Sequence, residues 1–135
     1  MNEETVKNWI TKAENDFKIG KDEMQTENPA TDGICFHMQQ CVEKYLKAYL
    51  IYHSKAFRKT HDIAELIELC SEIEPEFKEL YKTGAVELTD YAVEVRYGDE
   101  VYFPTLEEAK EAIEVCEKVK EFVITKLKEK GFMFE

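Results

Sequence analysis

Glycine and proline are scarce in this chain, with only five and three copies among 135 residues. Because these residues interrupt regular structure, their scarcity favours long helices. No window alternates apolar and polar residues for long enough to predict a strand. No apolar run approaches the roughly 18–20 residues that span a bilayer, and no basic segment followed by an apolar one opens the chain. We therefore expect no membrane span, no signal peptide and a cytoplasmic location.

Several catalytic signatures are also missing. The sequence contains no GxGxxG, P-loop, HExxH or GxSxG motif, and each of those chemistries needs the absent residues. The three histidines are not spaced as a metal-binding pair on one helix face. The four cysteines are far apart and form no CxxC pair, so we interpret them as small hydrophobes in a reduced core; they are Cys35, Cys41, Cys70 and Cys116. We expect neither a metal nor a cofactor.

The composition is that of an ordinary globular protein, with 44% hydrophobic and 35% charged residues. A chain of this length is long enough to bury a core and short enough for one domain, which we expect to span residues 1–135. Apolar residues recur at steps of three and four, a pattern typical of amphipathic helices. The predicted helices cover about residues 4–25, 30–53, 61–73, 75–97 and 105–130.

Local signals refine these helices. Pro29 suits the first turn of the second helix, with Asn28 as its cap. We expect Gly84 to kink or interrupt the fourth helix. Thr105 and Glu108 have the spacing of a capping box, Gly131 ends the last helix, and the apolar tail 132–134 packs on the body or on a second subunit. The predicted fold is all-α, an up-and-down bundle of four long helices with an additional short helix.

Charge is distributed unevenly along the chain, whose formal net charge is −11. Residues 44–61 contain five basic residues and no acidic one, whereas the rest of the chain has 13 Lys and Arg against 29 Asp and Glu. A local positive patch on an acidic body favours a specific anionic partner. The alternative is a solvated basic end of one helix. The overall acidity argues against a broad nucleic-acid surface, though not against a small nucleotide pocket.

Polar residues on one side of the second helix and in later segments form the candidate ligand-binding set. Lysine and arginine give charge-assisted hydrogen bonds to phosphate, and glutamine can donate and accept toward a base or ribose. Tyrosines in these segments could stack on a base, although at helical spacing they are also typical core residues. The candidate residues are His37, Gln40, Lys44, Lys47, Arg58, His61, Arg96 and Tyr97.

Three blocks resemble those of prokaryotic HEPN-domain proteins: FHMQQCVEKYLKAYLI, THDIAELI and YAVEVRYGD. The resemblance implies a helical bundle, usually a homodimer, related to the substrate-binding subunits of nucleotidyltransferases. Many such proteins act with a minimal nucleotidyltransferase, some as toxin and antitoxin. The positions that match the family blocks are Gln39, Gln40, Glu43, Lys44 and Lys47 in the first, His61 in the second, and Arg96 and Tyr97 in the third.

One departure from the family pattern bears on catalysis. HEPN ribonucleases carry an Arg followed, after four to six residues, by a His, but those positions after Arg96 hold Val101, Tyr102 and Phe103. Metal-independent RNA cleavage needs a general acid–base, for which His is the usual residue. We therefore expect a non-catalytic nucleotide-binding module. The alternatives are a divergent ribonuclease that uses Arg96 with His37 or His61, and a purely structural helical homodimerisation partner.

Overall fold

The computed structural model of the chain describes residues 2–92, 96–97 and 100–134, with side chains described outside 93–100. Helices account for nearly all of its regular structure, so the predicted all-α class is confirmed. A short hairpin of two-residue strands precedes the last helix. The elements are α1 (Glu3–Met24), α2 (Thr31–Tyr52), α3 (Ile63–Ile73), the 3₁₀ helices η1 (Pro75–Lys82) and η2 (Val86–Ala92), β1 (Arg96–Tyr97), β2 (Glu100–Val101) and α4 (Leu106–Glu129).

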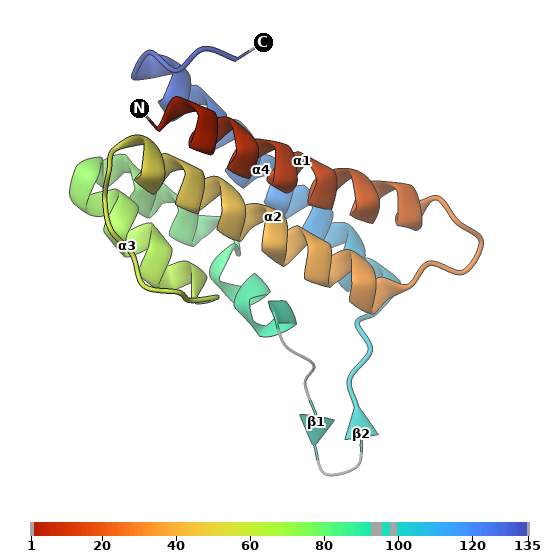
Figure 1. Cartoon of the computed structure of the whole chain (residues 1–135). Coiled ribbons are helices and arrows are strands. Elements are labelled where there is room, and N and C mark those ends of the chain that lie inside the picture. The colour runs from red at the N-terminus through yellow and green to blue at the C-terminus, as the bar shows by residue number, and fades with distance from the viewer. Residues whose placement is uncertain (1, 93–95, 98–99, 135) are drawn as a thin grey trace.

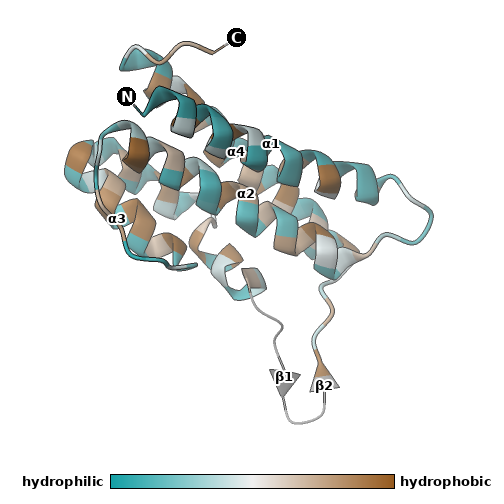
Figure 2. Ribbon diagram, viewed as in Figure 1, coloured by the Kyte–Doolittle hydropathy of each residue, from teal (hydrophilic) through white to brown (hydrophobic). Residues whose placement is uncertain are grey.

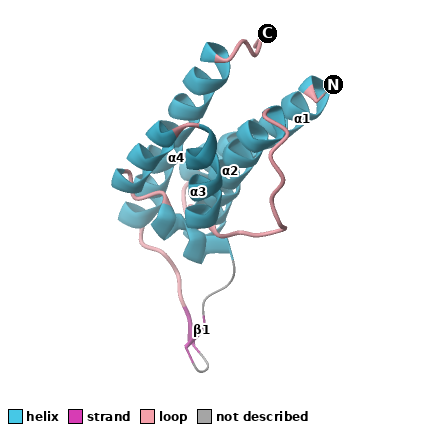
Figure 3. Cartoon of the chain, turned by 90° about the vertical axis from the view of Figure 1, so that its left-hand side faces the viewer, coloured by secondary structure: helices cyan, strands magenta, loops and turns pink. Residues whose placement is uncertain are grey.

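Helix α2 lies at the centre of the bundle, where it packs against α1, α3, η2 and α4 (Figure 1). Thirteen of its 22 residues are buried. The outward face of α1, by contrast, is largely hydrophilic (Figure 2). Both chain ends lie at one end of the bundle, and the hairpin projects from the other (Figure 3). Because this central helix is buried on most sides, several of its polar residues, among them Gln39, Glu43 and Lys47, lie inside the protein.

Two of the three predicted helix-end signals are confirmed. Thr105 and Glu108 form the expected capping box at the start of α4. Gly131 has a φ of +98° and ends α4, because few other residues adopt this conformation without strain. The predicted cap of α2 is wrong: the helix begins at Thr31, and the residue before it is Ala30, whose side chain makes no cap. The Thr31 hydroxyl instead donates to the Pro104 carbonyl at 2.7 Å, which ties the start of α2 to the segment before α4.

The segment predicted as one long helix over 75–97 differs from the prediction. It forms two 3₁₀ helices, η1 and η2, separated at Gly84, whose φ is +89°. A residue with this left-handed backbone conformation cannot continue a right-handed helix, so Gly84 separates η1 from η2. The chain then enters the hairpin, in which Arg96 pairs with Val101 and Tyr97 with Glu100, where no strand was predicted.

The C-terminal tail packs on the body, as expected. Phe132 is buried, and its ring lies edge-on to Tyr52 with the centroids 5.7 Å apart. The Tyr52 hydroxyl donates to the Lys130 carbonyl at 2.9 Å. All four cysteines are free and buried, in agreement with their interpretation as core residues. Within the described residues, no helix is long and apolar enough to cross a membrane.

His53 is the residue that caps the C-terminal end of α2. Its Nε2 atom is buried without a hydrogen-bond partner in the described structure, and its ring contacts that of Tyr49 at 4.5 Å between centroids. Burial, with a smaller effect of Lys130, lowers the pKa of His53 below its ordinary 6.5. The unfolded chain therefore binds this proton more readily, and we expect the free energy of unfolding to fall as pH drops from about 6.5 toward the folded pKa.

Chemical denaturation at several pH values measures this effect. His53→Leu removes the titrating group, so its stability should change less than that of the wild type between about pH 7 and 5.5. Parallel curves for the two proteins would contradict the prediction. Two carboxylates affect stability in a different pH range. The pKa values of Glu43 and Glu74 are lowered from 4.5, so the stability that they contribute is lost only as pH falls below that value.

Candidate functional site

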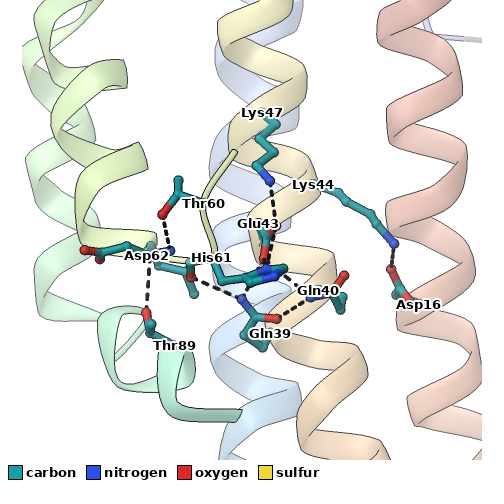
Figure 4. Close-up of polar contacts among 11 residues, drawn as sticks. Asp16, Gln39, Gln40, Glu43, Lys44, Lys47, Thr60, His61, Asp62 and Thr89 are labelled. Carbon is teal, nitrogen blue, oxygen red and sulfur yellow. Dashed lines mark hydrogen bonds and ion pairs between the residues drawn. The ribbon is translucent and has the colours of Figure 1, made fainter. Parts of the chain in front are cut away.

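The side chain of Glu43 is the centre of a buried polar network on α2 (Figure 4). Glu43 is only 4% exposed, and its carboxylate accepts hydrogen bonds from Lys47 Nζ at 2.6 Å and from Gln39 Nε2 at 2.8 Å. His61, in the loop before α3, contacts the same carboxylate through Nδ1 at 3.0 Å. We call these residues, together with Gln40, the Glu43 network.

Glu43 is ionised in this setting. Burial alone raises the pKa of its carboxyl group, but hydrogen bonds from Lys47, His61 and Gln39 outweigh burial and leave the pKa below its usual value. A carboxylate only accepts hydrogen bonds, so the Nδ1 atom of His61 carries a hydrogen. The network is therefore a charged carboxylate surrounded by donors.

Lys47 is held inside the protein rather than presented to solvent. It is 6% exposed, and its ammonium group lies 5.8 Å from the ring centroids of both Trp9 and Phe57. A lysine that has a carboxylate at 2.6 Å and two aromatic rings around it is already neutralised and desolvated. Its role in this arrangement is to hold α2 against α1 and the loop before α3.

His61 and Gln40 are the members of the network that reach the surface. The side chain of His61 is 56% exposed, and its backbone carbonyl accepts from Gln39 at 3.4 Å. The amide nitrogen of Gln40 donates to Gln39 Oε1 at 2.7 Å. The local fold places His61 because Asp62 caps the first turn of α3 through Glu65 N. At the same turn, the Ile63 amide donates to Thr89 of η2 at 3.2 Å.

A second carboxylate, Asp16 on α1, binds two other predicted site residues. Asp16 is 6% exposed and contacts His37 Nδ1 at 2.7 Å and Lys44 Nζ at 2.6 Å. Asp16 was not among the predicted site residues. Its position three residues after Ala13, on the apolar stripe of α1, is the signal that would have found it, because a carboxylate on a buried stripe needs a partner.

The basic stretch 44–61 is largely neutralised within the molecule. Lys55 binds Glu72 at 2.6 Å, and Arg58 binds Glu65 through two nitrogens. With Lys44 and Lys47 also paired, four of the five cations have carboxylate partners. Arg58 is exposed and does not join the Glu43 network. The positive patch seen in the sequence is thus much weaker in the folded protein.

Arg96 and Tyr97 form β1 by their backbone, but their side chains lie outside the described residues. The structure therefore describes six of the eight predicted site residues. It joins Gln40, Lys47 and His61 in one cluster, His37 and Lys44 in another, and leaves Arg58 apart. Gln39 and Glu43 were named only through the family blocks. Among the described side chains, no group of three or more His, Cys, Asp or Glu is placed to hold a metal ion.

Comparison with known proteins agrees with this architecture. The HEPN domain profile matches residues 6–129, and the chain belongs to the HEPN domain family. The crystal structure of an archaeal HEPN homologue superposes with a TM-score of 0.71 at 23% identity, covering 90% of this chain and 97% of that one.

A second crystal structure, of a protein from Thermus thermophilus, gives a TM-score of 0.73 at 24% identity and covers 94% of this chain and all of that one. At these identities the similarity shows the fold alone. No curated protein matches the sequence. The family predicted from the three sequence blocks is therefore confirmed, and the activity has to be argued from the site.

Proposed function

We propose that the chain is a nucleotide-binding helical module and the non-catalytic partner of a minimal nucleotidyltransferase. The observation that carries the proposal is the pair Gln40 and His61. Both reach solvent, and both are held from behind by the buried carboxylate of Glu43 or its partner Gln39. Side chains fixed in this way lose little conformational freedom on binding, so they suit ligand recognition.

The free atoms of the pair have complementary chemistry. The Nδ1–H of His61 is used by Glu43, which leaves Nε2 to accept from a ribose hydroxyl, or to donate to a phosphate oxygen when the ring is protonated. The amide nitrogen of Gln40 is used by Gln39, which leaves the Gln40 carbonyl oxygen to accept from a base or ribose. His61 can thus bind the phosphate or sugar, and Gln40 can accept from the base or ribose, which is consistent with a nucleotide ligand.

Five of the six other predicted ligand-binding residues divide into two groups, and the sixth, Arg58, is paired with Glu65 outside the network. His37, Lys44 and Lys47 are bound to buried carboxylates, and in this proposal they hold the helices rather than the ligand. Arg96 and Tyr97 remain candidate ligand residues in the hairpin. Thr89 of η2 accepts from the backbone amide of Ile63, in the first turn of α3.

The proposal is non-catalytic because the sequence after Arg96 lacks the histidine of the ribonuclease pattern. His61 and His37, the residues that a divergent ribonuclease would use, bind different carboxylates, Glu43 and Asp16, and so belong to separate clusters. Membership of the HEPN family supports a homodimer and a nucleotidyltransferase partner, with a toxin–antitoxin pair as one form of such a system.

Calorimetric titration with ATP and GTP, with and without Mg²⁺, tests the binding step. His61→Ala and Gln40→Ala should each weaken binding about 10-fold or more, because each removes a hydrogen bond to a polar or charged group. Arg58→Ala is the matched control and should bind as the wild type does, since Arg58 lies outside the network. No heat with any nucleotide would reject the binding function.

Two further experiments test the partner and the lack of catalysis. Co-expression with the product of the neighbouring gene, followed by pulldown and intact mass, should recover a nucleotidyltransferase complex, and the free chain should elute as a dimer. Labelled RNA should stay intact. RNA cleavage that disappears in Arg96→Ala would instead favour the divergent ribonuclease.

A further inference from the structure

A cavity of about 460 Å³ opens at the hairpin end of the bundle, apart from the Glu43 network. Its walls come from the first turns of α2, the end of η2 and the segment 101–104. Its size lies within the range of about 300–1,000 Å³ that is typical of small-molecule sites. Phe36 in its wall lies one helical turn before Gln40, so the cavity adjoins the proposed ligand-binding face.

Aromatic rings dominate the cavity and are unusually open to solvent. Phe36 is 39% exposed, Tyr102 is 42% exposed and Phe103 is 66% exposed. Tyr91 is half-buried in the same wall. Exposed rings that line one concavity offer faces on which a flat heterocycle can stack, as nucleobases do on aromatic side chains. The shape and lining thus favour a planar aromatic ligand over an extended aliphatic one.

The polar side chains of the cavity select the kind of heterocycle. Among the side chains that the structure describes, Asp32 and Asp90 are the charged residues in the cavity wall, and none of the lining residues is a Lys, Arg or His. Neither carboxylate has a hydrogen-bond or ion-pair partner in the part of the chain that the structure describes. Free carboxylates offer only acceptors and repel phosphate, so they favour a ring edge that carries several N–H donors.

Guanine has such an edge. Its N1–H and its 2-amino group lie side by side and match the two oxygens of one carboxylate, whereas adenine presents a single amino group beside a ring acceptor. Adenine would therefore place a ring nitrogen lone pair against a carboxylate oxygen. The two carboxylates of the described wall therefore favour guanine over adenine.

We propose that this cavity binds the guanine base of the nucleotide ligand, stacked on Phe36 and Tyr102, with Asp32 or Asp90 accepting from N1–H and the 2-amino group. The sugar and phosphate leave the acidic cavity along α2 toward Gln40 and His61. This inference rests on the proposed nucleotide-binding function and specifies its ligand.

Titration calorimetry with GMP and AMP tests the assignment. GMP should bind about 10-fold or more tightly than AMP, the size of preference that one good bidentate contact gives. The double variant Asp32→Asn/Asp90→Asn should lose most of this preference while circular dichroism stays unchanged. Phe36→Ala should weaken both nucleotides. Tyr81→Ala removes an exposed ring that is not in the cavity wall and should change neither affinity.

Failure of this inference is distinguishable from failure of the proposed function. Equal affinities for GMP and AMP, with no effect of the two Asp→Asn changes but a loss in His61→Ala, would overturn the guanine site and keep nucleotide binding. Tighter binding of AMP than of GMP would also overturn the guanine site and keep nucleotide binding. The absence of binding for every nucleotide would overturn both.

Discussion

Replacing Glu43 with alanine should lower the free energy of unfolding by about 3–5 kcal/mol, because it leaves a buried lysine without its counter-charge. Lys47 is 6% exposed, and its ammonium group lies 5.8 Å from the ring centroids of Trp9 and Phe57. Gln39 and His61 lose their shared acceptor at the same time. Urea denaturation followed by circular dichroism measures the loss.

Two comparisons show whether the loss comes from the unpaired charge. Glu43→Leu combined with Lys47→Met removes both charges and keeps the volume, so this double variant should recover most of the stability lost in Glu43→Ala. Glu65→Ala breaks the exposed pair with Arg58 and should leave the unfolding midpoint nearly unchanged. A Glu43→Ala protein as stable as the wild type would mean that the network does not hold the bundle together.

Hydrophobic spacing in the sequence predicted the long helices well. The ranges expected for α1, α2, α3 and α4 agree with the structure to within one or two residues at each end. This agreement has a physical reason: α1, α3 and α4 each bury a stripe of apolar residues, α2 is buried on most sides, and apolar residues at alternating steps of three and four are the pattern of an α-helix. The capping of α2 was predicted wrongly, because the hydrogen bond that holds this end, from Thr31 to Pro104, joins residues 73 positions apart.

The candidate site was harder to predict because its charges are paired across elements. Lys44 is neutralised by Asp16 of α1, and Lys55 by Glu72 of α3. A count of charges along the chain cannot show such partners, so the stretch 44–61 looked more basic than it is. Similarly, Glu43 is one of many acidic residues in the sequence, and only the fold shows that it is the buried acceptor shared by Lys47 and His61.

The 3₁₀ segments explain the remaining difference between the predicted and observed folds. Phe77 and Leu80 are three residues apart, as are Ala85 and Leu88, and all four are buried. A step of three fits one turn of a 3₁₀ helix as well as it fits an α-helix stripe. Periodicity therefore identified which residues face inward in this region but could not identify the type of helix that presents them.

Since 3₁₀ helices are weak on their own, tertiary packing must hold η1, and Phe77 is one of its two buried side chains. Its ring is fully buried between Tyr49 of α2 and Phe122 of α4, at centroid distances of 4.4 and 5.0 Å. Phe77→Ala should lower the free energy of unfolding by about 3–5 kcal/mol, through lost burial and the cavity left behind. Urea denaturation measures the total loss of stability, and amide hydrogen exchange shows which part of the chain is destabilised.

The exchange experiment separates local from global loss. In Phe77→Ala, amides of residues 75–82 should exchange much faster relative to those of α2 than in the wild type, because η1 loses its anchor while the central helix keeps the others. Glu79→Ala, an exposed change in the same 3₁₀ helix, should leave both stability and exchange nearly unchanged. Uniformly faster exchange across the chain would contradict this account and would mean that η1 unfolds only with the whole bundle.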